Sequence, residues 1–242
     1  MLHIFKKEFN GFLDSLIGVA VVVVFLIAIG LLTWVFPETS VLDYGFADME
    51  TLFTLGPFVL IFLVPAITMR SFAEERKLGT LEWLLTKPVS EGSIVFGKFL
   101  AAVCLVIIAL IPTITYYFTL SYLGDPPGNI DTSAVIGSYT GMVLLGAVFC
   151  SIGIFASTLV TNQVVSFMLA AFLCFFFYAG FDSAAALTND GATALLIKQL
   201  GIQYHFESMS RGLIDSRDLV YFAGVMGIMM LSAKTVLSSR SW

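Results

Sequence analysis

The sequence predicts an all-α integral membrane protein with six transmembrane helices, because it is very apolar and its apolar residues fall in long unbroken runs. Of its 242 residues, 58% are hydrophobic and only 12% are charged, and the mean hydropathy is +0.95. Soluble domains average about 25% charged residues. At about 20 residues per span, six spans and their loops account for the whole length. We therefore expect a single membrane domain over 1–242.

The apolar runs predict helices rather than strands, since they are continuous and do not alternate with polar residues. Lipid offers the backbone no hydrogen-bond partners, and a helix satisfies its own. The predicted spans are about 16–36, 52–69, 99–123, 136–160, 164–181 and 220–237. Prolines in the second and third spans predict kinks in those helices; they are Pro57, Pro65 and Pro112. Glycines in the fourth span permit close helix packing; they are Gly137, Gly141, Gly146 and Gly153.

Residues 1–14 predict an amphipathic helix that lies in the membrane interface. Phe5 and Phe9 recur at helical spacing, and Lys6 and Lys7 belong to the polar positions between them. Lysines opposite phenylalanines are typical of an interfacial helix. A cleaved signal peptide is the weaker interpretation, because the apolar run that follows is too long and no small-residue cleavage site comes after it.

The basic residues predict the orientation. Nine of the 12 Lys and Arg residues lie in the N-terminal segment, the loop 70–98 and the C-terminal segment. The positive-inside rule places these regions, and so both termini, in the cytoplasm. The loops near 37–51 and 124–135 have no basic residue. The segment 182–219 then lies outside, where we expect it to dip into the outer leaflet and cover the exit of a path; a solvated loop is the alternative.

No catalytic or metal-binding constellation emerges from the sequence. His3 and His205 fall on opposite sides of the membrane in this topology, and we expect His205 to be solvated on the outer surface. Cys104, Cys150 and Cys174 each lie inside an apolar run and are expected to be small buried residues. The net charge of −5 disfavours nucleic acid as a partner. No charge stands clearly in the middle of a span, which disfavours a carrier driven by an ion gradient.

One motif resembles a nucleotide site but is rejected. The stretch from Gly92 to Lys98 matches the first seven positions of a phosphate-binding loop, GxxxxGK. The next position should be Ser or Thr, which reaches the magnesium ion, and here it is Phe99. No strand-forming segment precedes the motif. We therefore expect no cofactor in this chain, and we interpret Lys98 as an anchor at the membrane interface.

The loop 70–98 contains the densest cluster of charge. Residues 73–77 favour a helix, Gly79 can break it, and Thr80 can cap a second short helix. In that second helix Leu81 and two further leucines form one apolar face. Spacing alone leaves two interpretations open, which are a connector lying on the membrane surface and a rigid helix that docks onto a soluble partner.

A resemblance favours docking. The residues Glu74-Glu-Arg-Lys-Leu-Gly-Thr-Leu-Glu82, then Leu84-Leu-Thr-Lys-Pro-Val-Ser90 and Gly97-Lys98-Phe-Leu-Ala101, resemble the signature between the second and third spans of ABC-2-type transporter permeases. The six-span hydropathy and the long outer segment before the last span agree with it. Within that segment, Ser210-Arg-Gly-Leu-Ile-Asp-Ser-Arg-Asp-Leu-Val-Tyr221 resembles the gliding-motility-associated permease subunit, with the nitrous-oxide-operon permeases as the second choice.

The resemblance implies a subunit that is not an enzyme and has no ATPase activity of its own. Two membrane subunits pair, identical or related, and two copies of a separate ATP-binding subunit, which hold ATP and magnesium, dock beneath them. The resemblance further implies an exporter in the bacterial inner membrane, surrounded by lipid. The implied coupling residues are Glu74, Glu75, Arg76, Gly79, Thr80, Leu81, Glu82, Leu84, Leu85 and, in the short turn between spans four and five, Asn162. The implied outer residues are Arg211, Gly212, Asp215, Arg217 and Asp218.

Two rival functions stay open. One is a membrane anchor that transports nothing and uses the same ATPase to transmit force. The other is an intramembrane lipid-modifying enzyme, which is disfavoured because polar groups facing the membrane interior are lacking. Substrate flux separates a transporter from an anchor.

Overall fold

The computed structural model describes residues 2–44, 47–85, 89–188 and 190–239. Every element in these ranges is helical, and six helices are long and apolar enough to cross a membrane. The elements are α1 (Leu2–Leu13), α2 (Leu16–Trp34), α3 (Val41–Tyr44), α4 (Glu50–Thr68), α5 (Arg70–Lys77), α6 (Thr80–Leu85), α7 (Glu91–Leu110), η1 (Ile111–Thr113), α8 (Ile114–Leu123), α9 (Thr132–Leu159), α10 (Gln163–Phe175), η2 (Phe176–Gly180), α11 (Phe181–Ala186), α12 (Gly191–Lys198), α13 (Ile202–Ser210) and α14 (Ser216–Ser238).

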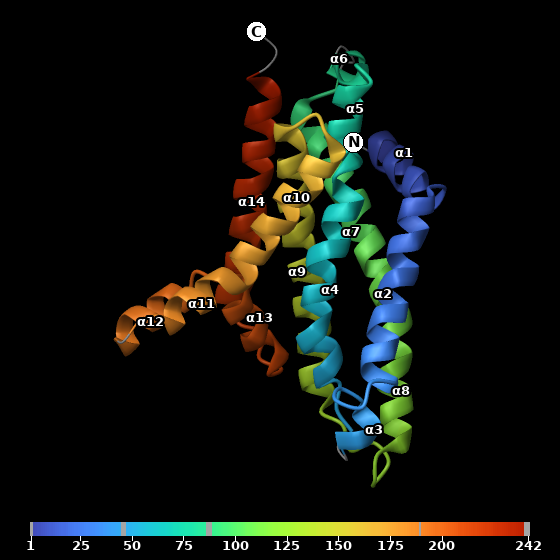
Figure 1. The fold of residues 1–242 in the computed structure, drawn as a ribbon, viewed down its shortest axis with the longest axis vertical. Coiled ribbons are helices and arrows are strands. Elements are labelled where there is room, and N and C mark those ends of the chain that lie inside the picture. The colour runs from blue at the N-terminus through green and yellow to red at the C-terminus, as the bar shows by residue number, and fades with distance from the viewer. Residues whose placement is uncertain (1, 45–46, 86–88, 189, 240–242) are drawn as a thin grey trace.

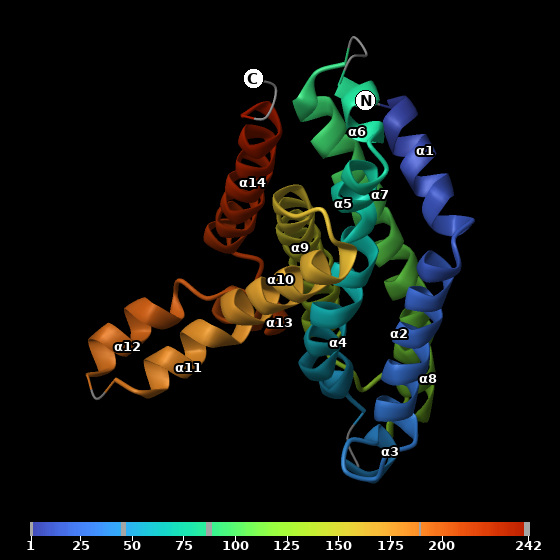
Figure 2. The same cartoon turned by 45° about the horizontal axis from the view of Figure 1, so that its top comes forward.

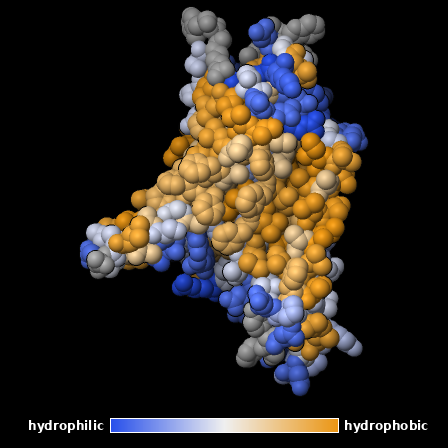
Figure 3. Space-filling view, viewed as in Figure 1, coloured by the Kyte–Doolittle hydropathy of each residue, from blue (hydrophilic) through white to orange (hydrophobic). Residues whose placement is uncertain are grey.

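The two ends of the bundle carry different parts of the chain (Figure 1). Helices α1, α5 and α6 and the C-terminal end of α14 gather at one end, and α3 lies at the other with the end of α8. Hydrophobic residues form a broad belt around the middle of the molecule, and hydrophilic residues cluster toward both ends (Figure 3). This distribution is the one that a membrane requires, because lipid solvates an apolar middle and water the two ends.

Helix α9 is the centre of the bundle, and its glycines allow close contact on several sides. A Cβ atom at Gly153 would overlap the Thr68 hydroxyl of α4, and one at Gly146 would lie 2.7 Å from a methyl carbon of Val106 in α7. Close approach through small residues is a common way to pack membrane helices. The glycine pattern in the fourth span is thus confirmed as a packing feature.

The interfacial helix meets the first span at a fixed elbow. The Ser15 hydroxyl accepts a hydrogen bond from the Gly18 N–H at 3.0 Å and donates one to the Phe12 carbonyl at 3.0 Å. It therefore caps α2 while holding the end of α1. A Cβ atom at Gly18 would overlap the Phe12 carbonyl oxygen, so the elbow needs a glycine there.

Helices extend into the predicted loop 70–98 from both of its ends. The second span continues almost without a break from α4 into α5, so a helix extends from Glu50 to Lys77. The third span begins at Glu91, where the Ser90 hydroxyl caps α7. Lys98 had been assigned to a loop because it is charged. It lies in α7 because two carboxylates neutralise it, as described below.

The third and fifth spans contain irregular turns. Pro112 lies in the 3-10 turn η1 between α7 and α8, as the predicted kink requires. The fifth span includes the π-helical turn η2 and continues through α11 to Ala186, so the boundary expected at 181 falls inside a helix. Among the described residues of α4, the helix continues through both Pro57 and Pro65.

Helices α11 and α12 form a hairpin that projects sideways from the bundle (Figures 1 and 2). Lys198 of α12 forms a 2.8 Å ion pair with Asp182 of α11, and this neighbour raises the pKa of the Lys198 ammonium. Leu187 at the end of α11 is 87% exposed, and Leu196 of α12 is 64% exposed. The hairpin therefore presents apolar side chains to its surroundings, while α13 returns and packs against α9.

Candidate coupling site

Lys98 joins three helices at the end of the bundle that carries α5 and α6. Its ammonium donates hydrogen bonds to Glu75 Oε1 of α5 at 2.8 Å and to Glu8 Oε1 of α1 at 3.0 Å. The Lys98 side chain is 2% exposed, and the two glutamates are each 16% exposed. Charge-assisted hydrogen bonds of this length are among the strongest in proteins. They fix α1 and α5 to α7.

The surroundings of Lys98 explain why α7 can contain a buried charge. The Phe72 ring of α5 lies 5.1 Å from the ammonium, where its face attracts a cation. Lys7 of α1 is 3.8 Å from Glu8 and 4.0 Å from Glu75, but its side chain is 70% exposed. The predicted role of Lys98 as an anchor at the membrane interface stays a prediction, but its ammonium is buried and paired within the chain. Residues 92–98 are also helical rather than a phosphate-binding loop.

A second contact holds α5 to the central helix. The Ser157 hydroxyl of α9 accepts hydrogen bonds from the N–H groups of Phe72 at 2.9 Å and Ala73 at 3.0 Å, and it donates to the Met69 carbonyl at 3.2 Å. The first N–H groups of a helix have no partner in their own helix. Ser157 supplies that partner from 84 and 85 residues away, so the start of α5 is set by α9.

The predicted helix–break–helix pattern is confirmed at α5 and α6. Gly79 has a φ of +67°, a conformation that favours glycine, and it separates the two helices. Thr80 does not precede α6 as a cap but is its first residue, and its hydroxyl donates to the Glu75 carbonyl at 3.3 Å. Glu82 is exposed. Leu81 is partly buried against the hydrophobic core, and the side chains of Leu84 and Leu85 lie outside the described residues.

The acidic residues of α5 have partners within the chain. Glu74 accepts two hydrogen bonds from the Arg70 guanidinium, at 2.9 and 3.2 Å, and Glu75 accepts from Lys98. Arg76 is half-buried. Glu74 and Glu75 therefore stabilise the site through contacts within the chain. Glu82 is the exposed acidic residue of α5 and α6. The contact of these residues with a partner subunit stays a prediction.

Asn162 has a local structural role. Its side-chain oxygen accepts a hydrogen bond from the Val164 N–H at 2.9 Å and caps α10. Asparagine is a preferred residue at this position, because its side chain satisfies one of the unpaired N–H groups. The side chain is exposed, and the second, smaller contact predicted for it remains untested.

The predicted outer residues divide into exposed and buried groups. Asp215 caps α14 by accepting from the Arg217 N–H at 2.9 Å, and Gly212 has a φ of +80°. Arg211 and Arg217 are exposed. Asp218, by contrast, is buried.

The expectation of a solvated His205 is wrong. Its side chain is 12% exposed, and its Nδ1 atom lies 2.7 Å from Asp218 Oδ1. Its Nε2 atom is 2.9 Å from the Gln199 carbonyl, and its ring stacks on Tyr221 with centroids 3.8 Å apart. The cluster fastens the turn between α12 and α13 to α14.

Sequence reasoning missed Glu8, Ser157 and the pairing of Lys98. One signal was present, since a lysine within the first turns of an apolar helix calls for a buried acidic partner. The partner could not be named, because Glu8 is 90 residues away along the chain.

Comparison with known proteins supplies the family. The model for ABC-2 family transporter proteins matches residues 2–238. This chain belongs to the ABC-2 transporter family. As an ABC-2 permease it is a multi-pass membrane subunit, and family membership implies partnership with an ABC ATPase subunit. A search of curated proteins found no match.

Family membership gives the α5–α6 region its functional meaning. Permeases of this family are typically the non-catalytic membrane component, so the energy of ATP must reach the ABC-2 permease through a protein contact. Helices α5 and α6 lie at one end of the bundle (Figure 1), are fixed to α9 by Ser157, and are fixed to α1 and α7 by Lys98.

Proposed function

We propose that this ABC-2 permease is the membrane half of an ATP-driven exporter in a bacterial inner membrane, with both termini in the cytoplasm. Two copies of a separate ATPase subunit, which hold ATP and magnesium, dock at the end of the bundle that carries α5 and α6. A second permease subunit completes the path. The observation that supports this most strongly is the rigid connection of α5 to three other helices through Lys98 and Ser157.

In the proposed mechanism the docked subunit moves α6, and the connected helices follow. When ATP draws the two ATPase subunits together, α5 pulls on Glu8 through Lys98, so α1 moves with it. The elbow at Ser15 passes the movement to α2. Ser157 passes it to α9, which contacts α4, α7, α10, α13 and α14. Interfaces of packed helices tend to have discrete arrangements, so small shifts at one end are amplified.

The exposed face of α6 is the proposed docking surface, and Glu82 tests it. The variant Glu82→Arg should weaken association with the ATPase subunit, because reversing a charge at an interface opposes complementary charges. The matched variant Lys77→Glu reverses an exposed charge in the neighbouring α5. Co-purification with the ATPase subunit is the readout, and the chain alone should hydrolyse no ATP. Robust ATPase activity from the isolated chain would contradict the proposal.

The finer parts of the proposal concern transport and motility. Export, rather than anchoring, predicts ATP-dependent substrate flux in proteoliposomes that contain the complete complex. The link to gliding motility rests on the resemblance of residues 210–221 alone. Loss of gliding after deletion, with restoration by the intact gene, tests that link separately from transport.

A further inference from the structure

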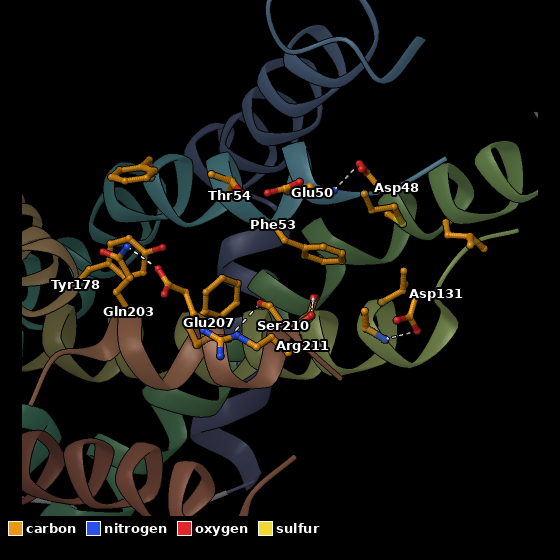
Figure 4. Close-up of a pocket in the computed structure, with 17 residues that line it drawn as sticks. Asp48, Glu50, Phe53, Thr54, Asp131, Tyr178, Gln203, Glu207, Ser210 and Arg211 are labelled. Atoms are coloured by element: carbon orange, nitrogen blue, oxygen red, sulfur yellow. Dashed lines mark hydrogen bonds between the residues drawn. The ribbon is translucent and has the colours of Figure 1, made fainter. Parts of the chain in front are cut away.

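A cavity of about 510 Å³ opens where α13 approaches the N-terminal ends of α4 and α9 (Figure 4). This volume falls in the range of small-molecule sites, about 300–1,000 Å³. Aromatic side chains from three parts of the chain contribute to its wall: Phe53 and Phe58 of α4, Tyr178 of η2 and Phe206 of α13. The N-terminal ends of α4 and α9, which line the cavity, lie far along the bundle from α5 and α6 (Figure 1), and the cavity lining includes none of the residues of the coupling contacts.

The charged groups around the cavity are mostly acidic. The lining includes the carboxylates of Asp48, Glu50, Asp131 and Glu207 and the single guanidinium of Arg211. Carboxylates in excess over cations attract a positive ligand, and low-dielectric walls strengthen that attraction. Glu207 Oε1 accepts from the Gln203 amide at 2.8 Å.

Tyr178 provides an independent indication that the cavity receives a ligand. Its side chain lines the cavity although the residue is only 3% exposed. Among the described residues its hydroxyl makes no side-chain hydrogen bond, and the hydroxyl oxygen is not one of the fully buried unpartnered atoms, so it faces the cavity. Figure 4 shows Tyr178 beside Gln203 and Glu207. Its ring packs edge-on against Phe58, with centroids 5.5 Å apart. An aromatic ring next to a carboxylate suits a ligand that is both apolar and positively charged.

We propose that this cavity binds an organic cation with an apolar body, such as an alkylated ammonium or phosphonium group. Aromatic faces attract such cations, and quaternary ammonium groups in particular are recognised by aromatic cages. The carboxylates, Glu207 foremost, supply the opposite charge. The proposal rests on the proposed function in one respect, since it names the class of molecule that the exporter carries. The same cation chemistry belongs to a free amphiphile and to the head group of a choline lipid.

The experiment measures equilibrium binding of tetraphenylphosphonium to the purified full chain in phosphatidylglycerol nanodiscs. Glu207→Gln should weaken binding about fivefold or more, because it removes the nearest charge and keeps the shape. Tyr178→Phe should change binding by less than about twofold, because it keeps the aromatic ring and tetraphenylphosphonium has no group that could hydrogen-bond to the hydroxyl. Arg211→Gln should strengthen binding, because the variant removes the one opposing cation of the lining. Asp43→Asn is the matched control, an exposed acidic residue outside the cavity, and should leave binding unchanged.

The gain expected for Arg211→Gln separates the proposal from loss of folding, which cannot improve binding. No saturable binding above empty nanodiscs would overturn the proposal, as would equal affinities of wild-type, Glu207→Gln and Arg211→Gln chains. Addition of phosphatidylcholine identifies the source of the cation. Competition with tetraphenylphosphonium indicates that the cavity takes a lipid head group, and no competition indicates that it takes a free cation. The assay contains no ATPase subunit. If the chain binds the cation but does not co-purify with the ATPase subunit, the cavity proposal stands and the coupling proposal is refuted. If the chain co-purifies with the ATPase subunit but does not bind the cation, the coupling proposal stands and the cavity proposal is refuted.

Discussion

The residue that most determines the coupling site is Lys98. A buried ammonium is tolerated only with close partners, and Lys98 has two carboxylates within 3.0 Å. Removing one partner of a buried ion pair is costly because the remaining charges stay buried without compensation. Loss of Lys98 would leave two glutamates, one on α1 and one on α5, close together without the cation that neutralises them.

We expect Lys98→Met to destabilise the protein by about 3 kcal/mol, which corresponds to a fall in Tm of roughly 6–12 °C for a chain of this size. Lys7→Met is the matched control, since Lys7 approaches the same carboxylates but is 70% exposed. Its effect should stay below about 1 kcal/mol. Thermal unfolding in detergent is the measurement. Neutralising the glutamates as well, in Lys98→Met/Glu8→Gln/Glu75→Gln, should restore much of the loss; equal effects of the two single variants would contradict this account.

At the scale of elements, α5 owes its position to α9. Ser157 satisfies two N–H groups at the start of α5 and one carbonyl at the end of α4. Ser151, one to two turns earlier in α9, is equally buried, but its hydroxyl bonds only to the Val148 carbonyl of its own helix. A comparison of variants at the two serines therefore distinguishes the effect of a hydrogen bond between helices from the effect of burial alone.

Hydrogen exchange of residues 70–77 tests this contact. Ser157→Ala should raise exchange at the start of α5 and cost about 1–2 kcal/mol, because the lost hydroxyl leaves buried N–H groups without a partner. Ser151→Ala should leave exchange in α5 unchanged, since it breaks no bond between helices. Unchanged protection of Phe72 and Ala73 in Ser157→Ala would show that α5 is held by other contacts.

The sequence predicts elements better than contacts, for physical reasons visible at particular residues. The six spans follow from unbroken apolar runs, and the break at Gly79 follows from its conformational freedom. The pairing of Lys98 with Glu8 and the burial of Asp218 against His205 could not be predicted. Each depends on which helices become neighbours, and a charge gives no sign of its distant partner. Helix α7 begins at Glu91, before the apolar run from which the third span was predicted, and it includes Lys98 together with its ion pairs.

For the whole molecule, the distribution of basic residues predicts which end faces the cytoplasm. The positive-inside rule predicts that α6 lies inside and the turn before α9 outside. In a cysteine-free background, a cysteine at Asn129 should react in intact cells with a thiol reagent that cannot cross the membrane. A cysteine at Glu82 should react only after the cells are opened. Both positions are exposed, so a difference in labelling reports the side of the membrane. Labelling of Glu82→Cys in intact cells would invert the orientation.

The central claim is that an ATPase subunit acts on this permease through α6. Photo-crosslinking tests it most directly, with p-benzoylphenylalanine placed at Glu82 in native membranes and, for comparison, at Asn129. The account predicts an adduct between the ATPase subunit and the chain labelled at Glu82, and none from Asn129, which belongs to the opposite end of the bundle. An adduct with the ATPase subunit from Asn129 but not from Glu82 would contradict the account.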